Sequence, residues 1–501
     1  MISENKLIYG ILSFAIFFHF IAINFYPVNF EFIFFEASNF IKEGFKKEIA
    51  EQFFKGQANT FFFSFVISFF SLIFPFFEPI HIGKIISLSS FIFIGYAGFN
   101  LYEKKVRNNK SDFYYIGFFF FFLTLNPLIW VFSYRATPDV ISMALGFYAF
   151  SIIYRYPKNN KYLYIAALIL GFATTLKIIV GIYLIAGMML VNFIYIKKNF
   201  LSCIIIGILY SIIPLIYFSI TYYNFNFFLF SAYYKNVLSV HTAPSDYFNN
   251  LILYLSFLFI FSSPILIGNI IFNFKNYFIK RKLLNMLMYL IVYYTGSTNL
   301  VSSVEMNFGF FSQYLNSNIL SGILYCSAYT LVLLIYQEAR RSYLLKNFLK
   351  FKLFLVVIVY LLIISSSLAS QRYLIVILPL FYFLFMTVIK NNLKFNIFFM
   401  LIICIPINIL LVTNHYLTGS VSKKMIEYVK ENDLLDKVCA GAIGAHAHHE
   451  FSKESRDTVT CSQMNIHIQN GTGENETGII HAVSSKKIFF LKKELHLKAT
   501  R

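Results

Sequence analysis

Uncharged apolar runs of about twenty residues recur along the chain and restrict its fold more than any other feature. As a helix rising 1.5 Å per residue, such a run can cross the hydrocarbon core of a bilayer, which is about 30 Å thick. Lipid offers no hydrogen-bond partner to a backbone, so the runs must form helices or a closed barrel. Barrel strands alternate polar and apolar residues, and Leu201–Phe218 does not alternate. An all-α polytopic membrane protein is therefore predicted.

Composition agrees with this fold class. Of the 501 residues, 58% are hydrophobic and 13% are charged, whereas soluble domains carry about 25% charged residues. The formal net charge of +19 would suggest a nucleic-acid partner in a soluble protein. Here Lys and Arg occur in short clusters between apolar runs, as in cytoplasmic loops of membrane proteins. We therefore expect a membrane-embedded chain and no nucleic-acid partner.

The order of apolar and basic segments predicts a topology. Apolar segments lie at 7–26, 59–77, 84–101, 113–132, 138–154, 162–176, 178–196, 200–221, 251–272, 283–303, 319–337, 353–366, 372–389 and 395–413. The positive-inside rule places the basic clusters at 104–110, 155–161, 197–198, 275–282, 340–352 and 390–394 in the cytoplasm. Only one of 59–77 and 84–101 can then cross fully, and Pro75 and Pro79 favour 59–77 as the partial segment. About 13 transmembrane helices result, with 27–58 and everything after Thr413 outside.

Two domains are expected. Residues 1–413 form the transmembrane domain, whose first helix is retained because no cleavage site follows it. Its first outer loop, 27–58, is predicted to contain amphipathic helices on the membrane surface, since Phe and Ile recur at helical spacing between Glu36 and Gln57. Residues 414–501 form a small extracytoplasmic α/β domain.

Within this second domain, a helix is predicted at Ser422–Glu431, strands at Lys437–Ala442 and Gly478–Leu491, and turns at Asn465–Gly478. Cys439 and Cys461 could form a disulfide there, because an extracytoplasmic compartment is oxidising.

Isolated ionisable residues at the membrane boundary are costly and are therefore candidates for function. Glu31 follows the first helix between Phe30 and Phe32, and partial desolvation makes it more basic, as a general base requires. Glu36 is the second candidate. The alternative is an interfacial acid that faces water. Arg135 and Asp139 lie in Ser-Tyr-Arg-Ala-Thr-Pro-Asp between two apolar segments, where Asp139 could simply complement a helix dipole.

Lys177 and Arg372 are cations outside the basic clusters, on the face opposite them. Lys177 closes Gly171–Lys177, and Arg372 precedes Tyr373 and an apolar segment. A lipid phosphate would supply the anionic partner that each needs. The alternative is snorkelling to the headgroups.

In order and architecture, these features resemble the GT-C glycosyltransferases over residues 7–413, especially protein O-mannosyltransferases and lipid A aminoarabinose transferases. The resemblance implies a polyprenyl-phosphate sugar donor and a catalytic carboxylate in the first outer loop. Glu31 would be the base, with Glu36 second. Lys177, Arg372 and Arg135 would bind the donor phosphate, near Asp139 and Tyr373. Many relatives carry an Asp-Glu pair where this chain has Phe30-Glu31.

The sequence thus predicts an integral-membrane glycosyltransferase of the cell envelope, in the bacterial inner (plasma) membrane, with its active site and C-terminal domain outside. Its partners would be the lipid-linked donor and a lipid, glycan or protein acceptor. A polysaccharide polymerase and a multi-helix transporter are the alternatives; a transporter is disfavoured by the lack of an internal repeat and of charge pairs within helices.

No cofactor or metal ligand is predicted. His446, His448 and His449 match no metal-binding spacing, so a divalent metal there is only the alternative.

Overall fold

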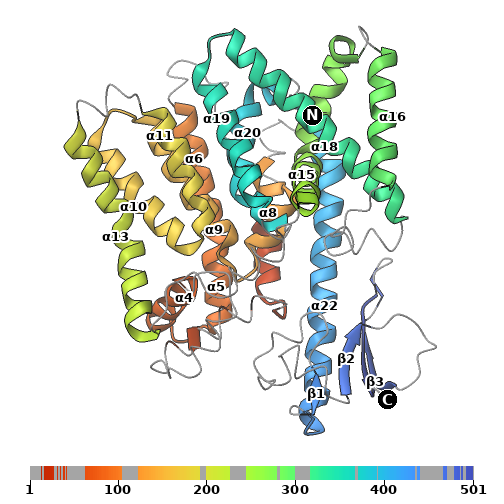
Figure 1. Cartoon of the computed structure of the whole chain (residues 1–501). Helices are drawn as coiled ribbons and strands as arrows, with labels where there is room; N and C mark the ends of the chain where they lie inside the picture. Colours follow the sequence, from red (N-terminus) through yellow and green to blue (C-terminus); the bar gives the residue numbers. More distant parts are fainter. Residues whose placement is uncertain are drawn as a thin grey trace.

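The computed structural model describes residues 13, 16–27, 31, 34, 38–39, 41, 62–103, 122–191, 199–225, 244–278, 282–298, 316–366, 371–391, 393–434, 437–439, 466–470, 479–485, 487–488 and 492–499. The described chain is mainly helical (Figure 1). Its α-helices are α4 (Phe62–Ile73), α5 (Pro79–Leu88), α6 (Ser90–Glu103), α8 (Pro127–Ser133), α9 (Pro138–Arg155), α10 (Asn160–Leu176), α11 (Ile182–Leu190), α13 (Phe200–Phe225), α15 (Pro244–Phe278), α16 (Lys282–Thr298), α18 (Ser317–Leu344), α19 (Phe348–Ile364), α20 (Leu374–Asn391), α21 (Leu393–Phe399) and α22 (Ile405–Glu431). Two short 3-10 helices, η2 (Ile178–Gly181) and η4 (Gln371–Tyr373), precede α11 and α20, and a π-helical turn, η5 (Met400–Cys404), joins α21 to α22.

Five described helical stretches are long and apolar enough to cross a membrane: 79–101, 200–223, 247–264, 317–344 and 396–431. A sixth arises if α8 and α9, which meet at 114°, count as one broken span. The expected 13 crossings are therefore not confirmed, since the other apolar helices are shorter. One of these is α4, with 12 described residues; the partial crossing expected at 59–77 stays a prediction.

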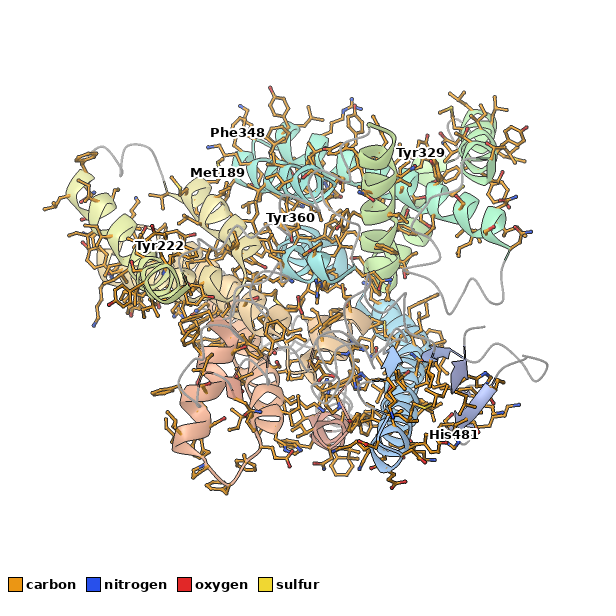
Figure 2. All side chains as sticks on the ribbon, turned by 60° about the horizontal axis from the view of Figure 1, so that its bottom comes forward. Met189, Tyr222, Tyr329, Phe348, Tyr360 and His481 are labelled. Carbon is orange, nitrogen blue, oxygen red and sulfur yellow. The ribbon has the colours of Figure 1, made fainter. Side chains whose placement is uncertain are left out.

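The outer surface of the helical body is apolar. Large hydrophobic side chains are exposed along α13, α16 and α19, among them Leu215, Leu290 and Ile363. Figure 2 shows Met189, Tyr222 and Phe348 at the edge of this body and Tyr360 in its interior. Exposed apolar surface on this scale would favour aggregation in water. It suits contact with lipid tails and supports a membrane protein.

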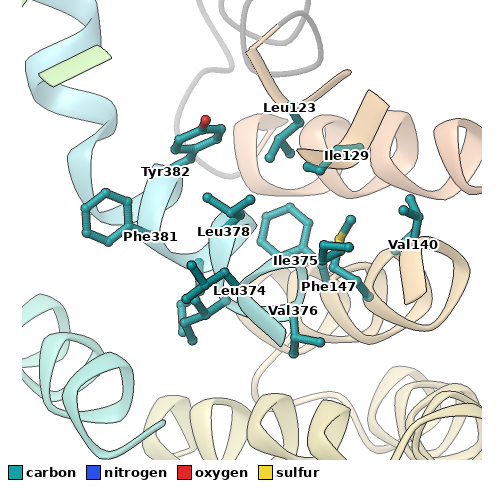
Figure 3. Close-up of a cluster of buried hydrophobic side chains, with 14 of the residues drawn as sticks. Leu123, Ile129, Val140, Phe147, Leu374, Ile375, Val376, Leu378, Phe381 and Tyr382 are labelled. Carbon is teal, nitrogen blue, oxygen red and sulfur yellow. The ribbon is translucent and has the colours of Figure 1, made fainter. Parts of the chain in front are cut away.

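A hydrophobic cluster holds α20 against α8 and α9 (Figure 3). Ile375, Val376 and Leu378 of α20 are fully buried and share this cluster with Val140 and Phe147 of α9. Because lipid is as apolar as these side chains, close packing rather than water exclusion stabilises such a contact. The cluster fixes the start of α20 beside the start of α9.

The C-terminal domain is a four-stranded sheet carried by α22 (Figure 1). Its strands are β1 (Val438–Cys439), β2 (Ile466–Asn470), β3 (Ile479–Ser484) and β4 (Glu494–Ala499), in the order β1-β2-β4-β3. The β1–β2 pair is parallel, and the β2–β4 and β3–β4 pairs are antiparallel. The turn prediction for 465–478 was wrong at β2, whose alternating Ile466-His-Ile468 pattern is typical of a strand.

α22 runs without a break through the domain boundary expected after Thr413. Its last turns present Val421, Met425, Ile426 and Val429 to the sheet, where they pack against strand residues including Leu497. The helix predicted at Ser422–Glu431 is therefore confirmed, as the last part of α22. Cys461 and the His446–His449 segment lie outside the described residues.

Candidate active site at the turn between α8 and α9

A sharp turn at residues 134–137 joins α8 to α9. Pro138 is the first residue of α9, and it holds Thr137 in an extended conformation (φ −134°, ψ 151°). The side chain of Ser87 on α5 donates to the Thr137 carbonyl at 3.0 Å and anchors the turn. The backbone N–H of Ala136 and the side chains of Arg135 and Asp139 are thereby placed around one point of the fold.

Glu31 lies against this turn. Its side chain is 1% exposed, and its Oε1 accepts a hydrogen bond from the Ala136 N–H at 3.0 Å. Residues 31, 34 and 38 are helical and buried, a spacing that puts them on one helical face. Burying a carboxylate is costly unless it is hydrogen-bonded or paired with charge. The alternative that Glu31 faces water is therefore wrong; Glu36 lies outside the described residues.

Two residues that the sequence analysis did not single out adjoin Glu31. Lys84 of α5 is buried, and its Nζ donates to the carbonyls of Ile23 (3.1 Å) and Phe25 (2.7 Å), at the end of the first helix. Lys84 also interacts electrostatically with Glu31 and Arg135. His415 of α22 places Nε2 3.6 Å from Glu31 Oε2. Each is an ionisable side chain alone in an apolar segment, which is the signal that could have identified it.

On the other side of the turn, Asp139 and Lys177 form a buried salt bridge. Asp139 is in the first turn of α9, as the sequence predicted, and Lys177 is the C-cap residue of α10. The helix-dipole interpretation of Asp139 is confirmed but incomplete, because its carboxylate also binds a buried ammonium group. Each charge is about 5% exposed, so each depends on the other.

Arg372 and Tyr373 in η4 adjoin this salt bridge. Arg372 interacts electrostatically with both Asp139 and Lys177. The Tyr373 ring centroid lies 5.3 Å from Lys177 Nζ and 5.7 Å from Arg372 Cζ, within cation–π range. The hydroxyl of Tyr360 on α19 donates to the Tyr373 carbonyl and fixes the start of α20.

The turn therefore joins two ionic clusters. Ala136 binds Glu31, and three residues later Asp139 binds Lys177, next to Arg372. Arg135, between them, rests on the Phe132 ring at 5.2 Å and interacts electrostatically with Lys84 and His415. Of the predicted site residues, only Glu36 is not placed. In the part of the chain that the structure describes, no three His, Cys, Asp or Glu side chains gather as a metal site would require.

The fold and site define a helical membrane protein with a buried, mostly cationic polar centre near its first helix. No known family model, curated protein or solved structure matches the chain in comparison.

Proposed function

We propose that this chain is an integral-membrane glycosyltransferase that moves a sugar from a polyprenyl-phosphate donor to an acceptor at the extracytoplasmic face of a bacterial inner membrane. One observation carries the proposal. One short turn contacts both a buried carboxylate, Glu31, through Ala136, and the Lys177–Arg372 cluster, through Asp139, although these residues are far apart in the sequence. Transfer from a lipid phosphate needs both kinds of group in one place.

Each group has a role in this chemistry. Glu31 accepts the proton of the acceptor hydroxyl or amine as that atom attacks the anomeric carbon. The bond from the anomeric carbon to the phosphate oxygen breaks, and the phosphate leaves with the electron pair. Arg372 and Lys177 stabilise the charge that develops on it. The polyprenyl chain of the donor remains in lipid, which accounts for a site built among apolar helices.

Asp139 sets how Lys177 acts. Since the salt bridge already neutralises the Lys177 charge, Arg372 is the stronger candidate for direct phosphate contact. Arg also binds phosphate in a two-pronged manner that Lys cannot reproduce. Tyr373 packs against both cations and limits their orientations.

A transporter is the second candidate, and one finding favours it. From the sequence we expected no charge pairs within helices, yet His415, in the interior of α22, lies beside Glu31. Buried ionisable pairs also occur on substrate pathways of transporters. Bond cleavage distinguishes the two candidates. A transferase breaks the bond between sugar and phosphate in its donor, whereas a transporter moves its substrate intact.

The chain's single Trp, Trp130 in α8, provides the test. It is buried four residues before the turn begins at Tyr134, so its fluorescence reports on binding there. Purified protein in nanodiscs should change its Trp130 emission on titration with polyprenyl monophosphate, and the neutral polyprenol of equal chain length should have no effect. The Arg372→Ala variant should raise the Kd for polyprenyl monophosphate about tenfold or more, because it loses one charged hydrogen bond to the phosphate.

Labelled polyprenyl-phosphate sugars are then offered with membrane extracts as acceptor source. Release of polyprenyl phosphate coupled to sugar transfer supports the proposal. The proposal is contradicted if Trp130 emission responds equally to polyprenyl monophosphate and to polyprenol. It is also contradicted if the intact donor crosses the membrane without cleavage of its sugar–phosphate bond.

A further inference from the structure

His415 has no role in the reaction proposed above, although it lies next to the proposed base, Glu31. It is 2% exposed, and its ring lies between those of Phe25 and Tyr134, with centroid distances of 6.4 and 5.4 Å. A buried imidazole needs a polar partner. The nearest carboxylate is that of Glu31, whose Oε2 is 3.6 Å from His415 Nε2.

Two cations and one backbone group lie around the His415 ring. Lys84 of α5 and Arg135 of the turn both interact electrostatically with His415, and the Tyr26 backbone carbonyl is a second acceptor near the ring. The phenol of Tyr134 is the other titratable group that faces it. A neutral imidazole with its proton on Nε2 can donate one hydrogen bond to a carboxylate.

Close helix packing fixes the ring in place. Gly419 lies one turn after His415 on the same face of α22, and a Cβ at Gly419 would be 2.7 Å from the Tyr26 carbonyl oxygen. Only glycine permits α22 to approach the chain after the first helix this closely. Direct contact therefore fixes how closely α22 approaches the chain at Tyr26, one turn away from His415.

We infer that His415 positions Glu31 for catalysis by donating its Nε2–H to Oε2 of the carboxylate. This inference rests on the proposed transferase function. Ala136 N–H holds Oε1, so the two donors together orient the carboxylate toward the acceptor. At 3.6 Å the pair is longer than a hydrogen bond, and such contacts commonly tighten when substrate binds.

Three substitutions separate positioning from packing. In His415→Gln, the longer amide can place an N–H near the position of Nε2. In His415→Asn the amide is too short to reach Glu31, and in His415→Phe the ring remains without a donor. We expect Asn and Phe to lower kcat by up to about 10²-fold, the cost of a misplaced catalytic group, with donor KM within about twofold. His415→Gln should lose much less: if His415→Asn lowers kcat by about 10²-fold, the kcat of His415→Gln should fall by no more than about tenfold.

His481→Gln is the matched control, because the same change is made in the C-terminal sheet, where His481 stacks on Tyr428. Its kcat should equal that of the wild type. Retention of polyprenyl-phosphate binding shows that each variant is folded. If the bulkier His415→Phe variant does not fold, His415→Asn alone tests the loss of the donor. The inference is overturned if Asn or Phe turns over at the wild-type rate, or if Gln is as impaired as Asn, while the wild type transfers sugar. If the wild type transfers no sugar from any carrier, the proposed function fails and this inference with it.

Discussion

At the scale of single residues, the buried charges of the site are also structural. Asp139 and Lys177 are each about 5% exposed and have each other as partners. Removing one member of a buried pair leaves an uncompensated charge, whereas replacing both by apolar groups is often nearly neutral for stability. Loss of activity in a single Lys177 variant would therefore not identify a role in donor binding. The pair must be changed together.

Lys177→Met should lower the free energy of unfolding by about 3–5 kcal/mol, and Asp139→Leu combined with Lys177→Met should recover most of it. Thermal unfolding in detergent measures both. Lys158→Met, in the exposed connection between α9 and α10, is the control and should change little. If the double variant is stable but binds polyprenyl phosphate more weakly, Lys177 contributes to the site as well as to the fold. Wild-type stability of the single variant would contradict the buried salt bridge.

Single residues also show what the sequence could predict about the site. Glu31, Arg135, Lys177 and Arg372 were identifiable because each is a charge standing alone at the end of an apolar segment. The pairing of Lys177 with Asp139, and of Glu31 with His415, was not predictable. It depends on which helix ends meet, and hydropathy contains no information about that.

At the scale of elements, small residues let helices approach closely. A Cβ at Gly171 of α10 would clash with the backbone carbonyl oxygen of Tyr210 in α13. Because the clash involves backbone, no change of side-chain conformation can remove it. Such close approach is the usual basis of helix association in membranes. The α10–α13 contact matters for the site because Lys177 directly follows the last residue of α10.

Gly171→Ala should separate α10 from α13 and destabilise the protein by about 1–3 kcal/mol, the usual cost of overpacking. Gly207→Ala is a matched control on α13, because its added methyl group would meet nothing within 4 Å. The control should be neutral or slightly stabilising, since Ala is a better helix former than Gly. Thermal unfolding of the two variants side by side is the measurement. Equal stability of both would contradict the packing of α10 on α13.

Helix positions followed well from the apolar runs, but helix ends did not. The segments expected at 138–154 and 162–176 correspond to α9 and α10. The segment expected to end at Thr413 continues as α22 to Glu431. Falling hydropathy marks where a chain leaves the apolar layer, while the helix itself persists as long as one face stays apolar. Val421 and Val429 supply that face.

At the scale of the whole molecule, one helix connects the C-terminal sheet to the candidate active site. α22 carries His415 next to Glu31 and, further along, the residues that pack on the sheet. The proposed function requires the sheet to lie on the extracytoplasmic side. That orientation rests on the basic cluster at 390–394, which precedes the last apolar segment.

A Cys-free background with one new cysteine tests the orientation. Lys487→Cys, exposed in the sheet domain, should react with an impermeant thiol reagent in intact spheroplasts. Arg340→Cys, exposed at the end of α18 in a basic cluster, should react only after lysis. The reverse pattern would contradict the topology and place the site on the wrong side for an extracytoplasmic acceptor.

The account depends most directly on Glu31. Glu31→Gln keeps the size of the side chain and can still accept the Ala136 N–H, but it cannot take a proton from the acceptor. With a labelled polyprenyl-phosphate sugar that the wild type uses, the account predicts that kcat falls by about 10²–10⁴-fold, while polyprenyl phosphate binds as before. Transfer by the folded variant at the wild-type rate would contradict the account and show that the catalytic base lies elsewhere.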